Sequence, residues 1–364
     1  MYKVFVADEL APEGIAALKE YAEIEIDFSP GLTVDEAIPH VKNADAIIVR
    51  SATKLKGQLL DAAARCKVIG RAGIGVDNID LDVSTERGIV VLNTPDANAT
   101  TTAELAIAHM FSLSRKLPEA DLSVRSGKWQ RNEFVGAEVS GKTVGIVGFG
   151  TIGRLLAERC LGLKMKVVAF DPFVTQQTFA EHGVETKDLD GLVAVSDYIT
   201  LHCPVTDGTR GLFSRERLLA MKAGSRIINC ARGGLIDEQA LCDVVNSGHL
   251  AGAALDVFEQ EPPIDSPLFA VPNIQFTPHL GASTEEAQTA VGVEISHQIA
   301  AFLIDGKIIN SVNVPSVDPD KLSQLNPYME LATKLGKVLC QMVEGPLFSV
   351  EIGGFGEASK FDSH

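Results

Sequence analysis

Three polar residues of different kinds follow three predicted strands, and together they could carry out a hydride-transfer reaction. They are Arg232, Glu261 and His279. An imidazole titrates near working pH, so His279 could take the proton of a substrate hydroxyl. Glu261 could hold that imidazole and favour its charged form, because a nearby carboxylate stabilises a cation. The planar guanidinium of Arg232 could bind a substrate carboxylate through two hydrogen bonds and polarise the adjacent carbonyl.

Each of these residues also has a simpler interpretation. A histidine after a strand often packs or caps, Arg232 could form a surface ion pair, and Glu261 precedes Pro262-Pro263 in what could be a solvated loop. The combination favours catalysis, because Pro-flanked loops and a Gly-Gly turn present these residue types at successive strand ends. Asp256 also ends a predicted strand, where it could bind the ribose beside a nicotinamide or hold the backbone.

A glycine-rich hexapeptide, Gly148-Phe149-Gly150-Thr151-Ile152-Gly153, follows an apolar run over residues 143–147. This spacing is typical of a dinucleotide-binding loop. Gly148 would make the tight turn, Gly150 would let backbone amides approach a diphosphate, and Gly153 would let the helix pack close to the strand. The diphosphate would lie at a helix N-terminus, where unpaired N–H groups favour negative charge. The sequence therefore predicts a dinucleotide cofactor.

Asp171 ends the next apolar run and indicates which dinucleotide binds. A carboxylate after the second strand accepts hydrogen bonds from the adenosine ribose and repels a 2′-phosphate, whereas an NADP site would have an arginine nearby. The residues that follow, Pro172-Phe173-Val174, include no cation. We therefore expect NAD as the cofactor.

A parallel sheet would bring these residues together. From residue 141 the sequence alternates strands and helices, with strands near Val144 and over 167–170, 198–201, 226–229, 253–257 and 274–276. Six strands in this pattern form a doubly wound unit, in which ligands bind beyond the carboxyl ends of the strands. Asp171, Arg232, Asp256 and His279 all follow such ends, so we expect them along one edge of one sheet.

The first 98 residues show the same alternation with five strands, which predicts a second parallel sheet. Capping-box spacing at Thr101 and Glu104 marks the start of a long helix, and the same spacing at Ser283 and Glu286 marks another that runs to about residue 305. If the later helix returns to the first domain, the nucleotide domain is an insertion. The expected fold is α/β, with a flavodoxin-like substrate domain (1–98 and 287–312), an inserted Rossmann nucleotide domain (99–286) and a short α+β remnant that begins an incomplete third domain (313–364).

A second glycine-rich loop, at residues 70–75, follows a strand of the first domain. It lacks the spacing and the helix start that a diphosphate requires, so we interpret it as a nest of backbone amides for a small anion. Arg50 and Arg71 lie around this loop, and Arg131 lies near Trp129 before the second alternating set. Several arginines at the predicted cleft of an acidic chain favour a doubly anionic substrate, although each could be an ordinary surface charge.

Composition limits the classes of partner. The 364-residue chain has 32 basic and 48 acidic residues, a formal charge of -16, so it would repel a polyphosphate backbone and we expect no nucleic-acid partner. No apolar run approaches the ~20 residues of a membrane span, and the N-terminal residues lack signal-peptide architecture. Six scattered cysteines form no CxxC pair and no zinc pattern. We expect a cytoplasmic protein with no membrane partner and no metal site.

Seven motifs make residues 1 to about 315 resemble the D-isomer-specific 2-hydroxyacid dehydrogenase family. They lie at 50–53 (RSAT), 70–78 (GRAGIGVDN), 93–95 (NTP), 148–153 (GFGTIG), 229–237 (NCARGGLID), 254–263 (ALDVFEQEPP) and 278–283 (PHLGAS). The resemblance implies that Arg232, Glu261 and His279 form the catalytic set. Together with the fingerprint it implies cofactor contacts from Ile74, Gly148, Gly150, Thr151, Ile152, Gly153, Asp171, Cys203, Cys230, Ala231, Arg232, Asp256, His279, Leu280, Gly281 and Ala282. It implies substrate contacts from Arg50, Ser51, Arg71, Gly73, Ile74, Arg131 and Arg232, the arginines at 50, 71 and 131 binding a phosphate.

The function that this resemblance implies is NAD-dependent oxidation of a phosphorylated D-2-hydroxy acid. The alternatives are a hydroxypyruvate or glyoxylate reductase, another D-2-hydroxyacid dehydrogenase, and an NADH-sensing corepressor that seeks peptide partners. Formate dehydrogenases of the same fold lack a glutamate partner for the histidine, so Glu261 argues against that activity.

Two further expectations concern the tail and the assembly. Residues 325–341 (LNPYMELATKLGKVLCQ) resemble the start of an extra domain in long members of the family, and the rest of that domain has no counterpart in this sequence. The apolar helix after Thr101 favours a homodimer or a higher homo-oligomer, because such a helix at a domain junction often meets its symmetry mate.

Overall fold

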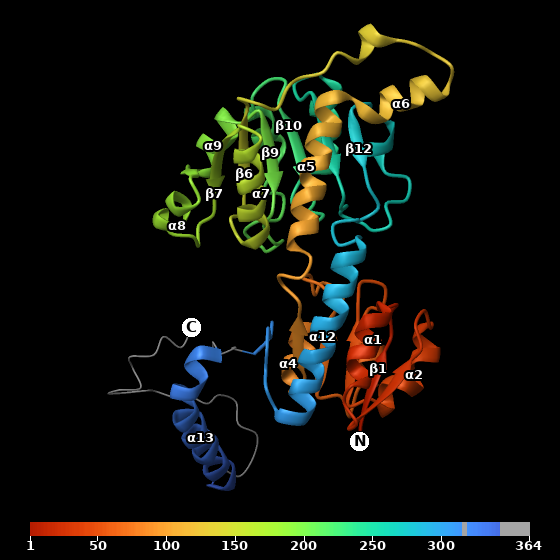
Figure 1. The fold of residues 1–364 in the computed structure, drawn as a ribbon, viewed down its shortest axis with the longest axis vertical. Coiled ribbons are helices and arrows are strands. Elements are labelled where there is room, and N and C mark those ends of the chain that lie inside the picture. The colour runs from red at the N-terminus through yellow and green to blue at the C-terminus, as the bar shows by residue number, and fades with distance from the viewer. Residues whose placement is uncertain (315–318, 343–364) are drawn as a thin grey trace. The chain divides into compact units, whose positions relative to one another are not determined.

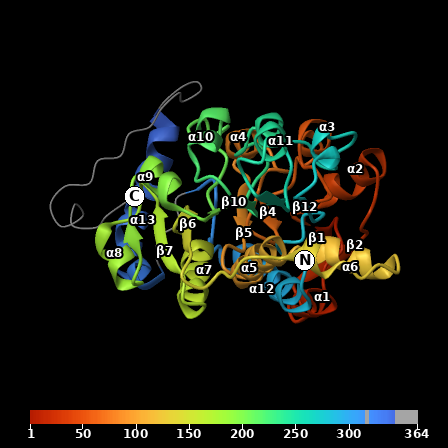
Figure 2. The same cartoon turned by 90° about the horizontal axis from the view of Figure 1, so that it is seen from above.

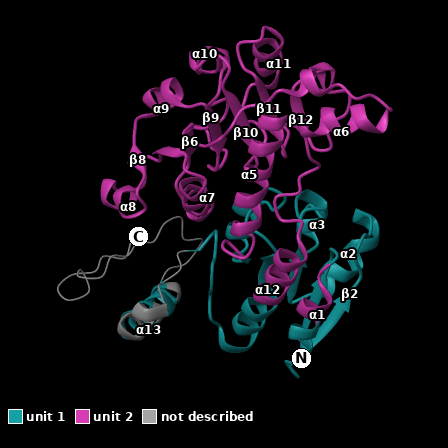
Figure 3. Cartoon of the chain, turned by 45° about the horizontal axis from the view of Figure 1, so that its top comes forward, with its two compact units in different colours: residues 1–9, 16–93, 295–364 teal, residues 10–15, 94–294 magenta. Residues whose placement is uncertain are grey.

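The structure is a computed structural model that describes residues 1–314 and 319–342. The chain forms two compact units, shown in different colours in Figure 3. The first comprises residues 1–9, 16–93 and 295–364, and the second comprises residues 10–15 and 94–294. Of the predicted third domain, residues 315–318 and 343–364 lie outside the described residues, and the segment between them is helix α13 (Pro319–Met342).

A five-stranded parallel sheet forms the core of the first unit. The strands are hydrogen-bonded in the order β2-β1-β3-β4-β5, which is the flavodoxin-like order. Short runs of Val and Ile form such strands because helices cover both faces of a parallel sheet, and every residue of β3 and β5 is buried. The strands are β1 (Tyr2–Val6), β2 (Ile24–Phe28), β3 (Ala46–Val49), β4 (Val68–Arg71) and β5 (Val90–Asn93), and they alternate with helices α1 (Pro12–Lys19), α2 (Val34–Asn43), α3 (Gly57–Asp61) and α4 (Leu81–Glu86).

The second unit contains a seven-stranded parallel sheet in the order β12-β11-β10-β9-β6-β7-β8. The strand order reverses at β6, because β7 lies on one side of it and β9 on the other. Six strands agree with the prediction, and the seventh, β8 (Glu185–Thr186), consists of two exposed residues that show no apolar pattern. The others are β6 (Thr143–Val147), β7 (Lys166–Phe170), β9 (Tyr198–Leu201), β10 (Arg226–Asn229), β11 (Gly252–Leu255) and β12 (Ile274–Phe276).

Helices cover both faces of the seven-stranded sheet. On one face α5 (Ala99–Arg115) and α7 (Thr151–Gly162) lie side by side, and their buried residues form one core with α8 (Gln176–Glu181). Figures 1 and 2 both show this pair. On the other face α9 (Leu189–Val195), α10 (Arg215–Ala220) and α11 (Glu238–Asn246) form a second core with the sheet. The predicted α/β class with two parallel sheets is confirmed.

Two helices begin at different residues from those that capping-box spacing predicted. Helix α5 has Asn98 rather than Thr101 at its N-cap. Helix α12 (Glu285–Asp305) begins after Thr284, whose hydroxyl accepts a hydrogen bond from the Ala287 N–H at 3.2 Å, so the predicted cap at Ser283 was wrong by one residue. The end of α12 at Asp305 agrees with the prediction.

Helix α12 belongs to both units, because residues 285–294 cluster with the second and residues 295–305 with the first. Its later part packs closely on β4. A Cβ atom placed on Gly70 would lie 2.7 Å from Cγ1 of Ile295. Beyond α12, Ser311 forms an antiparallel bridge to Leu92. The second unit is therefore an insertion in sequence, whereas the predicted domain boundaries at 98/99 and 286/287 stay predictions.

Among the described residues, no helix is both long and apolar enough to cross a lipid bilayer. In the same part of the chain, no group of three or more His, Cys, Asp or Glu side chains is arranged to hold a metal ion.

Candidate active site

The glycines of the fingerprint lie where side chains would collide with the backbone. Gly148 has a φ of 95°, and a Cβ atom there would lie 2.4 Å from the carbonyl oxygen of His202. A Cβ atom on Gly153 would lie 2.2 Å from the carbonyl oxygen of Gly148. By contrast, a Cβ atom on Gly150 would meet no heavy atom of the described residues within 4 Å. The loop is therefore tight on its protein side and open at Gly150.

That open position is the N-cap of α7. Within the described part of the chain, no side chain caps this helix end, so its first N–H groups remain available to a ligand. An anionic diphosphate fits here because these N–H groups and the helix dipole both favour negative charge. The two predicted contact residues next in sequence differ in exposure: Thr151 is exposed and donates a hydrogen bond to Oδ1 of Asp96 at 3.1 Å, whereas Ile152 packs partly into the core.

Asp171 follows β7 and is fixed by the backbone around it. Its Oδ2 accepts the N–H of Phe149 at 2.8 Å and its Oδ1 accepts the N–H of Phe173 at 2.9 Å. A carboxylate oxygen has two lone pairs, so each oxygen can accept one more hydrogen bond. The carboxylate is thus held directly beside the glycine-rich loop, with capacity left for ribose hydroxyls. These residues fit NAD.

Neutralising Asp171 is expected to weaken the preference for NAD over NADP. Asn at this position keeps one oxygen acceptor for the loop but removes the charge that repels a 2′-phosphate. In Asp171→Asn, the ratio of kcat/KM with NAD to kcat/KM with NADP should fall about tenfold or more, as measured by steady-state kinetics with both cofactors. An unchanged ratio would show that Asp171 does not select the cofactor.

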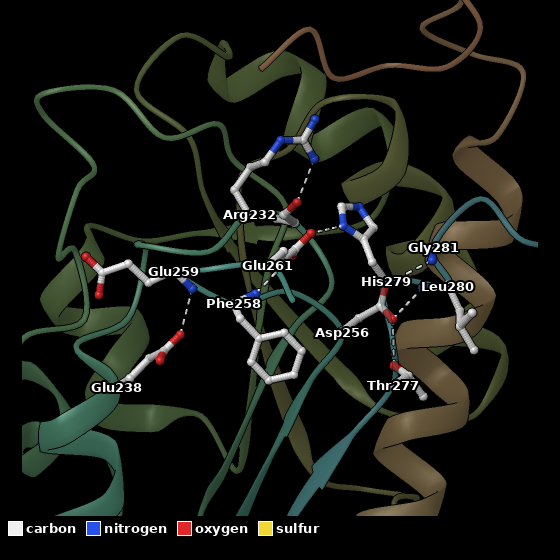
Figure 4. A network of polar contacts seen from close by, with 11 residues as sticks. Arg232, Glu238, Asp256, Phe258, Glu259, Glu261, Thr277, His279, Leu280 and Gly281 are labelled. Atoms are coloured by element: carbon white, nitrogen blue, oxygen red, sulfur yellow. Dashed lines mark hydrogen bonds and ion pairs between the residues drawn. The ribbon is translucent and has the colours of Figure 1, made fainter. Parts of the chain in front are cut away.

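Glu261 and His279 form the central contact of the site. Figure 4 shows the imidazole of His279 directed toward the carboxylate of Glu261. Nδ1 of His279 lies 2.7 Å from Oε2 of Glu261. The two residues follow the neighbouring strands β11 and β12, whose carboxyl ends lie at the same edge of the sheet. Because Nδ1 is engaged by the carboxylate, Nε2 is the ring nitrogen left for a substrate. His279 has a φ of 55°, in the left-handed region that a histidine rarely adopts.

The environment of Glu261 keeps its carboxylate charged. Partial burial acts to raise the pKa of Glu261, but the hydrogen bond and charge of His279 oppose it, together with the N–H of Phe258 and the charge of Arg232. The net effect holds the pKa of Glu261 below its ordinary value. Oε1 accepts the Phe258 N–H at 3.1 Å, so each carboxylate oxygen has a partner. A charged, oriented carboxylate can stabilise an imidazolium.

Arg232 lies on a turn after β10 that Asn229 holds closed. The Asn229 side chain accepts the N–H of Ala231 at 3.0 Å and donates to the carbonyl oxygen of Arg232 at 2.8 Å. The guanidinium donates to the Ala231 carbonyl oxygen at 2.6 Å. Figure 4 shows the Arg232 side chain on the same side of the sheet as Glu261 and His279. The structure therefore brings the three predicted catalytic residues together.

The loop that carries Glu261 packs directly on the turn that carries Arg232. A Cβ atom on Gly233 would lie 1.8 Å from the carbonyl oxygen of Phe258. Glu238, at the start of α11, accepts the N–H of Glu259 at 2.8 Å and fixes the same loop from the other side. Close backbone packing thus sets the spacing between the guanidinium and the carboxylate.

Asp256 is fully buried and holds the loop around His279. Its Oδ1 accepts the Thr277 hydroxyl at 2.6 Å and the Leu280 N–H at 2.7 Å, and its Oδ2 accepts the Gly281 N–H at 2.9 Å. The sequence left open whether Asp256 binds a ribose or holds the backbone, and the structure shows that it holds the backbone. Among the other predicted cofactor contacts, Ala282 follows Gly281 in this loop and is partly buried.

The two cysteines among the predicted cofactor contacts have protonated thiols. Burial raises the pKa of Cys203 to about 11 and that of Cys230 well above its ordinary value. A thiol in this state packs as a small apolar group rather than acting as a nucleophile. Cys203 and Cys230 follow β9 and β10 respectively, so they line the same sheet edge as the catalytic residues.

His202 directly follows β9, and its buried position predicts that the stability of the second unit depends on pH. Burial lowers the pKa of His202 from 6.5 to about 4. Between pH 6.5 and 4 the His202 imidazole therefore binds a proton in the unfolded state but not in the folded state. Its contribution to the free energy of unfolding should be highest above pH 6.5. We expect it to fall by up to about 3 kcal/mol as the pH drops from 6.5 to 4.

Urea unfolding of the wild type and of His202→Gln at pH 7.5, 5.5 and 4.5 tests this expectation. The stability advantage of the wild type should shrink across that range, because glutamine does not titrate. An advantage that stays constant from pH 7.5 to 4.5 would contradict it.

The predicted substrate residues of the first unit lie at the carboxyl ends of β3 and β4. Asp8 accepts the N–H of Arg50 at 2.6 Å, and the Asn78 side chain donates to the Arg50 carbonyl oxygen at 2.8 Å. Ser51 is exposed in the same loop. Polar contacts from Asp8 and Asn78 thus hold the backbone of this loop.

Arg71 and Gly73 are closely packed against each other in the first unit. Gly73 has a φ of 134°, and a Cβ atom on it would lie 1.5 Å from Nη1 of Arg71. Only glycine is compatible with this placement of the guanidinium. The Ile74 carbonyl oxygen accepts the Asn93 side chain at 2.7 Å. In the second unit, Arg131 begins an exposed 3-10 turn, Arg131–Phe134.

Sequence reasoning did not identify Asn229, Thr277 or His109. Asn229 contacts the backbone of the Arg232 turn, Thr277 contacts the Asp256 carboxylate, and His109 contacts the Thr277 hydroxyl. Asn229 and Thr277 are polar residues at strand ends, which is the same signal that identified Arg232 and His279. His109 lies in an apolar helix and gave no such signal.

Comparison with known proteins agrees with this geometry. Residues 107–281 match the family model of the D-isomer specific 2-hydroxyacid dehydrogenase NAD binding domain. The chain is 43% identical to a D-3-phosphoglycerate dehydrogenase of Methanocaldococcus jannaschii, over 99% of this chain and 68% of that protein.

Two solved structures have the same fold. NAD+-bound 3-phosphoglycerate dehydrogenase of Entamoeba histolytica is 30% identical with a TM-score of 0.74, covering 86% of this chain and 99% of that one. A glyoxylate reductase of Paecilomyes thermophila is 29% identical with a TM-score of 0.78, covering 85% and 98%. The chain therefore belongs to the D-isomer specific 2-hydroxyacid dehydrogenase family, whose members are NAD-dependent oxidoreductases.

Proposed function

We propose that the protein oxidises 3-phospho-D-glycerate to 3-phosphohydroxypyruvate with NAD, the first step of phosphorylated serine biosynthesis. The observation that carries the proposal is the 2.7 Å contact between His279 and Glu261, beside the turn of Arg232 and at the edge of the NAD-binding sheet. The substrate class is supported by the similarity to D-3-phosphoglycerate dehydrogenases over nearly the whole chain. The chain spans about two thirds of the length of that relative.

His279 is the proposed base. Its Nε2 takes the proton of the C2 hydroxyl as the C2 hydrogen leaves with its electron pair, and the C–O bond becomes a carbonyl. NAD supplies the hydride acceptor. The imidazolium that forms is stabilised by the Glu261 carboxylate at Nδ1, which the surrounding charges keep ionised. Arg232 binds the substrate carboxylate and polarises the C2 oxygen, so it favours the developing carbonyl.

The phosphate is the second anionic group of the proposed substrate. We assign it to Arg50, Arg71 and Arg131, with Ser51, Gly73 and Ile74 as further substrate contacts. A guanidinium can donate two parallel hydrogen bonds to two oxygens of one phosphate. Arginines of this kind suit a doubly anionic substrate, although the protein as a whole is acidic. The proposed cofactor contacts are the sixteen residues expected from the sequence.

Steady-state kinetics test the proposed substrate. We expect kcat/KM with 3-phospho-D-glycerate to exceed that with D-glycerate, D-lactate and, in the reducing direction, glyoxylate. Equal or better turnover of an unphosphorylated acid would rule out the phosphate assignment while leaving the oxidoreductase assignment intact.

The second candidate is a glyoxylate or hydroxypyruvate reductase, which the similarity to the Paecilomyes glyoxylate reductase favours. Arg131→Ala distinguishes the two. If Arg131 binds the phosphate, the variant should raise the KM for 3-phospho-D-glycerate about tenfold or more and leave the KM for glyoxylate almost unchanged, because one charged hydrogen bond is lost. Equal KM values in wild type and variant would favour the reductase.

We also propose that the protein is a cytoplasmic homodimer or a higher homo-oligomer. Helix α6 (Leu117–Arg125) and the segment after it expose several large apolar side chains, a group that monomers rarely leave in water. They are Leu117, Leu122, Val124, Trp129 and Val135, with exposed fractions of 53% to 79%. A second copy of the chain would cover this surface, and light scattering of the wild type and of Leu122→Asp would test it.

A further inference from the structure

A chain of three buried or partly buried polar side chains lies behind the His279 loop. Asp256, after β11, accepts the Thr277 hydroxyl at 2.6 Å. Oγ1 of Thr277, after β12, lies 3.1 Å from Nε2 of His109 on α5. Asp256 is fully buried and His109 is 6% exposed. These hydrogen bonds therefore connect helix α5, which packs on the sheet, to the loop that carries His279.

The hydrogen-bond directions in this chain are determined by its proton count. A carboxylate oxygen only accepts, and both oxygens of Asp256 already accept backbone N–H groups, from Leu280 and Gly281. Thr277 must therefore donate its single hydroxyl proton to Asp256. Its oxygen is then left to accept from His109, which requires the proton of His109 to be on Nε2. Burial lowers the pKa of His109 against the opposing charge of Asp256, so the imidazole is neutral at working pH.

The groups that Asp256 binds lie on both sides of His279 in the sequence. Thr277 precedes it by two residues, and Leu280 and Gly281 follow it directly. The N–H of His279 itself donates to the backbone oxygen of Asp256 at 3.0 Å. This arrangement keeps His279 in its left-handed conformation, with a φ of 55°. Such a conformation persists only where surrounding contacts enforce it.

We propose that Thr277 and His109 are positioning residues that act through Asp256 to hold His279 against Glu261. His109 fixes the orientation of the Thr277 hydroxyl, and this hydroxyl fixes the orientation of the Asp256 carboxylate. The carboxylate in turn holds the backbone of the loop that carries the His279 imidazole. The inference rests on the proposed role of His279 as the base. It assigns a function to a histidine that is 168 residues from its partner in sequence.

Thr277→Val and Thr277→Ser separate the hydroxyl from the shape of the side chain. Valine keeps the volume and removes the proton donor, so we expect kcat to fall about 10- to 100-fold with a change in KM of less than threefold, because misplacing a base by about 1 Å affects the chemical step. Serine restores the donor and should restore kcat to within about threefold of the wild type.

His109→Gln and His109→Met test the other link in the same way. Glutamine can place its side-chain nitrogen near the position of the imidazole Nε2, whereas methionine fills the space without a donor. We expect kcat of the methionine variant to fall about 3- to 30-fold and the glutamine variant to recover most of it. In the double variant Thr277→Val/His109→Met, the loss of kcat should equal that of Thr277→Val alone. Both substitutions interrupt the same series of hydrogen bonds, so the second adds no further loss.

A readout independent of turnover is hydrogen exchange of the Leu280 and Gly281 amides in the protein without cofactor. We expect faster exchange in Thr277→Val and near-wild-type exchange in Thr277→Ser. The matched control is Ser225→Ala, which removes a buried hydroxyl of the same unit that has no hydrogen-bond partner among the described residues. It should change neither kcat nor exchange at these amides.

The outcomes distinguish this inference from the proposed function. A Thr277→Val enzyme with wild-type kcat and wild-type exchange would overturn the inference, as would a loss that serine fails to restore. Additive losses in the double variant would remove His109 from the chain. If the wild type turned over none of the tested hydroxy acids, the proposed function would fail, and amide exchange would still decide whether Thr277 holds the loop.

Discussion

Replacing His279 by alanine is expected to lower kcat about 10²- to 10⁴-fold, the usual range for loss of a general base. The imidazole is the group that we propose takes the substrate proton, and its Nδ1 lies 2.7 Å from Oε2 of Glu261. Binding of NAD should survive, because the glycine-rich loop and Asp171 are fixed by contacts that do not involve this side chain. Stopped-flow kinetics measure the first quantity, and cofactor titration by fluorescence measures the second.

A second variant separates loss of the base from backbone strain. Alanine is disfavoured in the left-handed region that His279 occupies, whereas asparagine visits that region more readily. His279→Asn should therefore be as inactive as His279→Ala but more stable to urea. Turnover within tenfold of the wild type in either variant would refute the assignment of His279 as the base.

Replacing Gly233 by alanine is expected to lower kcat/KM about 100-fold or more. The added methyl carbon would lie 1.8 Å from the carbonyl oxygen of Phe258 and 2.7 Å from the Glu259 nitrogen, both backbone atoms. Real Cβ atoms essentially never lie within 3.0 Å of a neighbouring heavy atom, so the two loops must move apart. One of them carries Arg232 and the other carries Glu261, and a displacement of about 1 Å costs about 10²-fold in rate.

The matched control for this variant is Gly162→Ala. Gly162 ends α7, and a Cβ atom there would meet no heavy atom of the described residues within 4 Å. We expect wild-type kinetics and equal or slightly higher stability, since alanine favours the helix. Gly233→Ala should be less stable by about 1–3 kcal/mol. If it kept kcat/KM within threefold of the wild type, the spacing of the two loops would not control catalysis.

Most of the fold was predictable because strand residues of a parallel sheet form continuous apolar runs. The runs that became β9, β10 and β12 agree with the predicted bounds residue by residue. The strand β8 was missed because its two residues, Glu185 and Thr186, are exposed and lie at the sheet edge, where no burial selects apolar side chains. The cap of α12 was misplaced because Ser283 and Thr284 are adjacent and both can cap.

The sequence predicted those parts of the candidate site that depend only on the order of the strands. Glu261 and His279 follow neighbouring parallel strands, so their contact follows from topology once the sheet is assigned. The contact between Thr277 and His109 depends instead on which helix packs on this part of the sheet and on how that helix is rotated about its axis. A single polar residue in an apolar helix does not specify either, which is why sequence alone did not identify His109.

The reversal of strand order at β6 has a consequence for how this enzyme can evolve. Asp171, which we propose selects the cofactor, follows β7 on one side of β6. Arg232, Glu261 and His279 follow β10, β11 and β12 on the other side. Asp171 and the three proposed reacting groups therefore follow different strands, so a substitution at Asp171 changes none of the contacts that hold Arg232, Glu261 and His279. Cofactor preference and substrate chemistry can accordingly diverge as independent traits within one lineage.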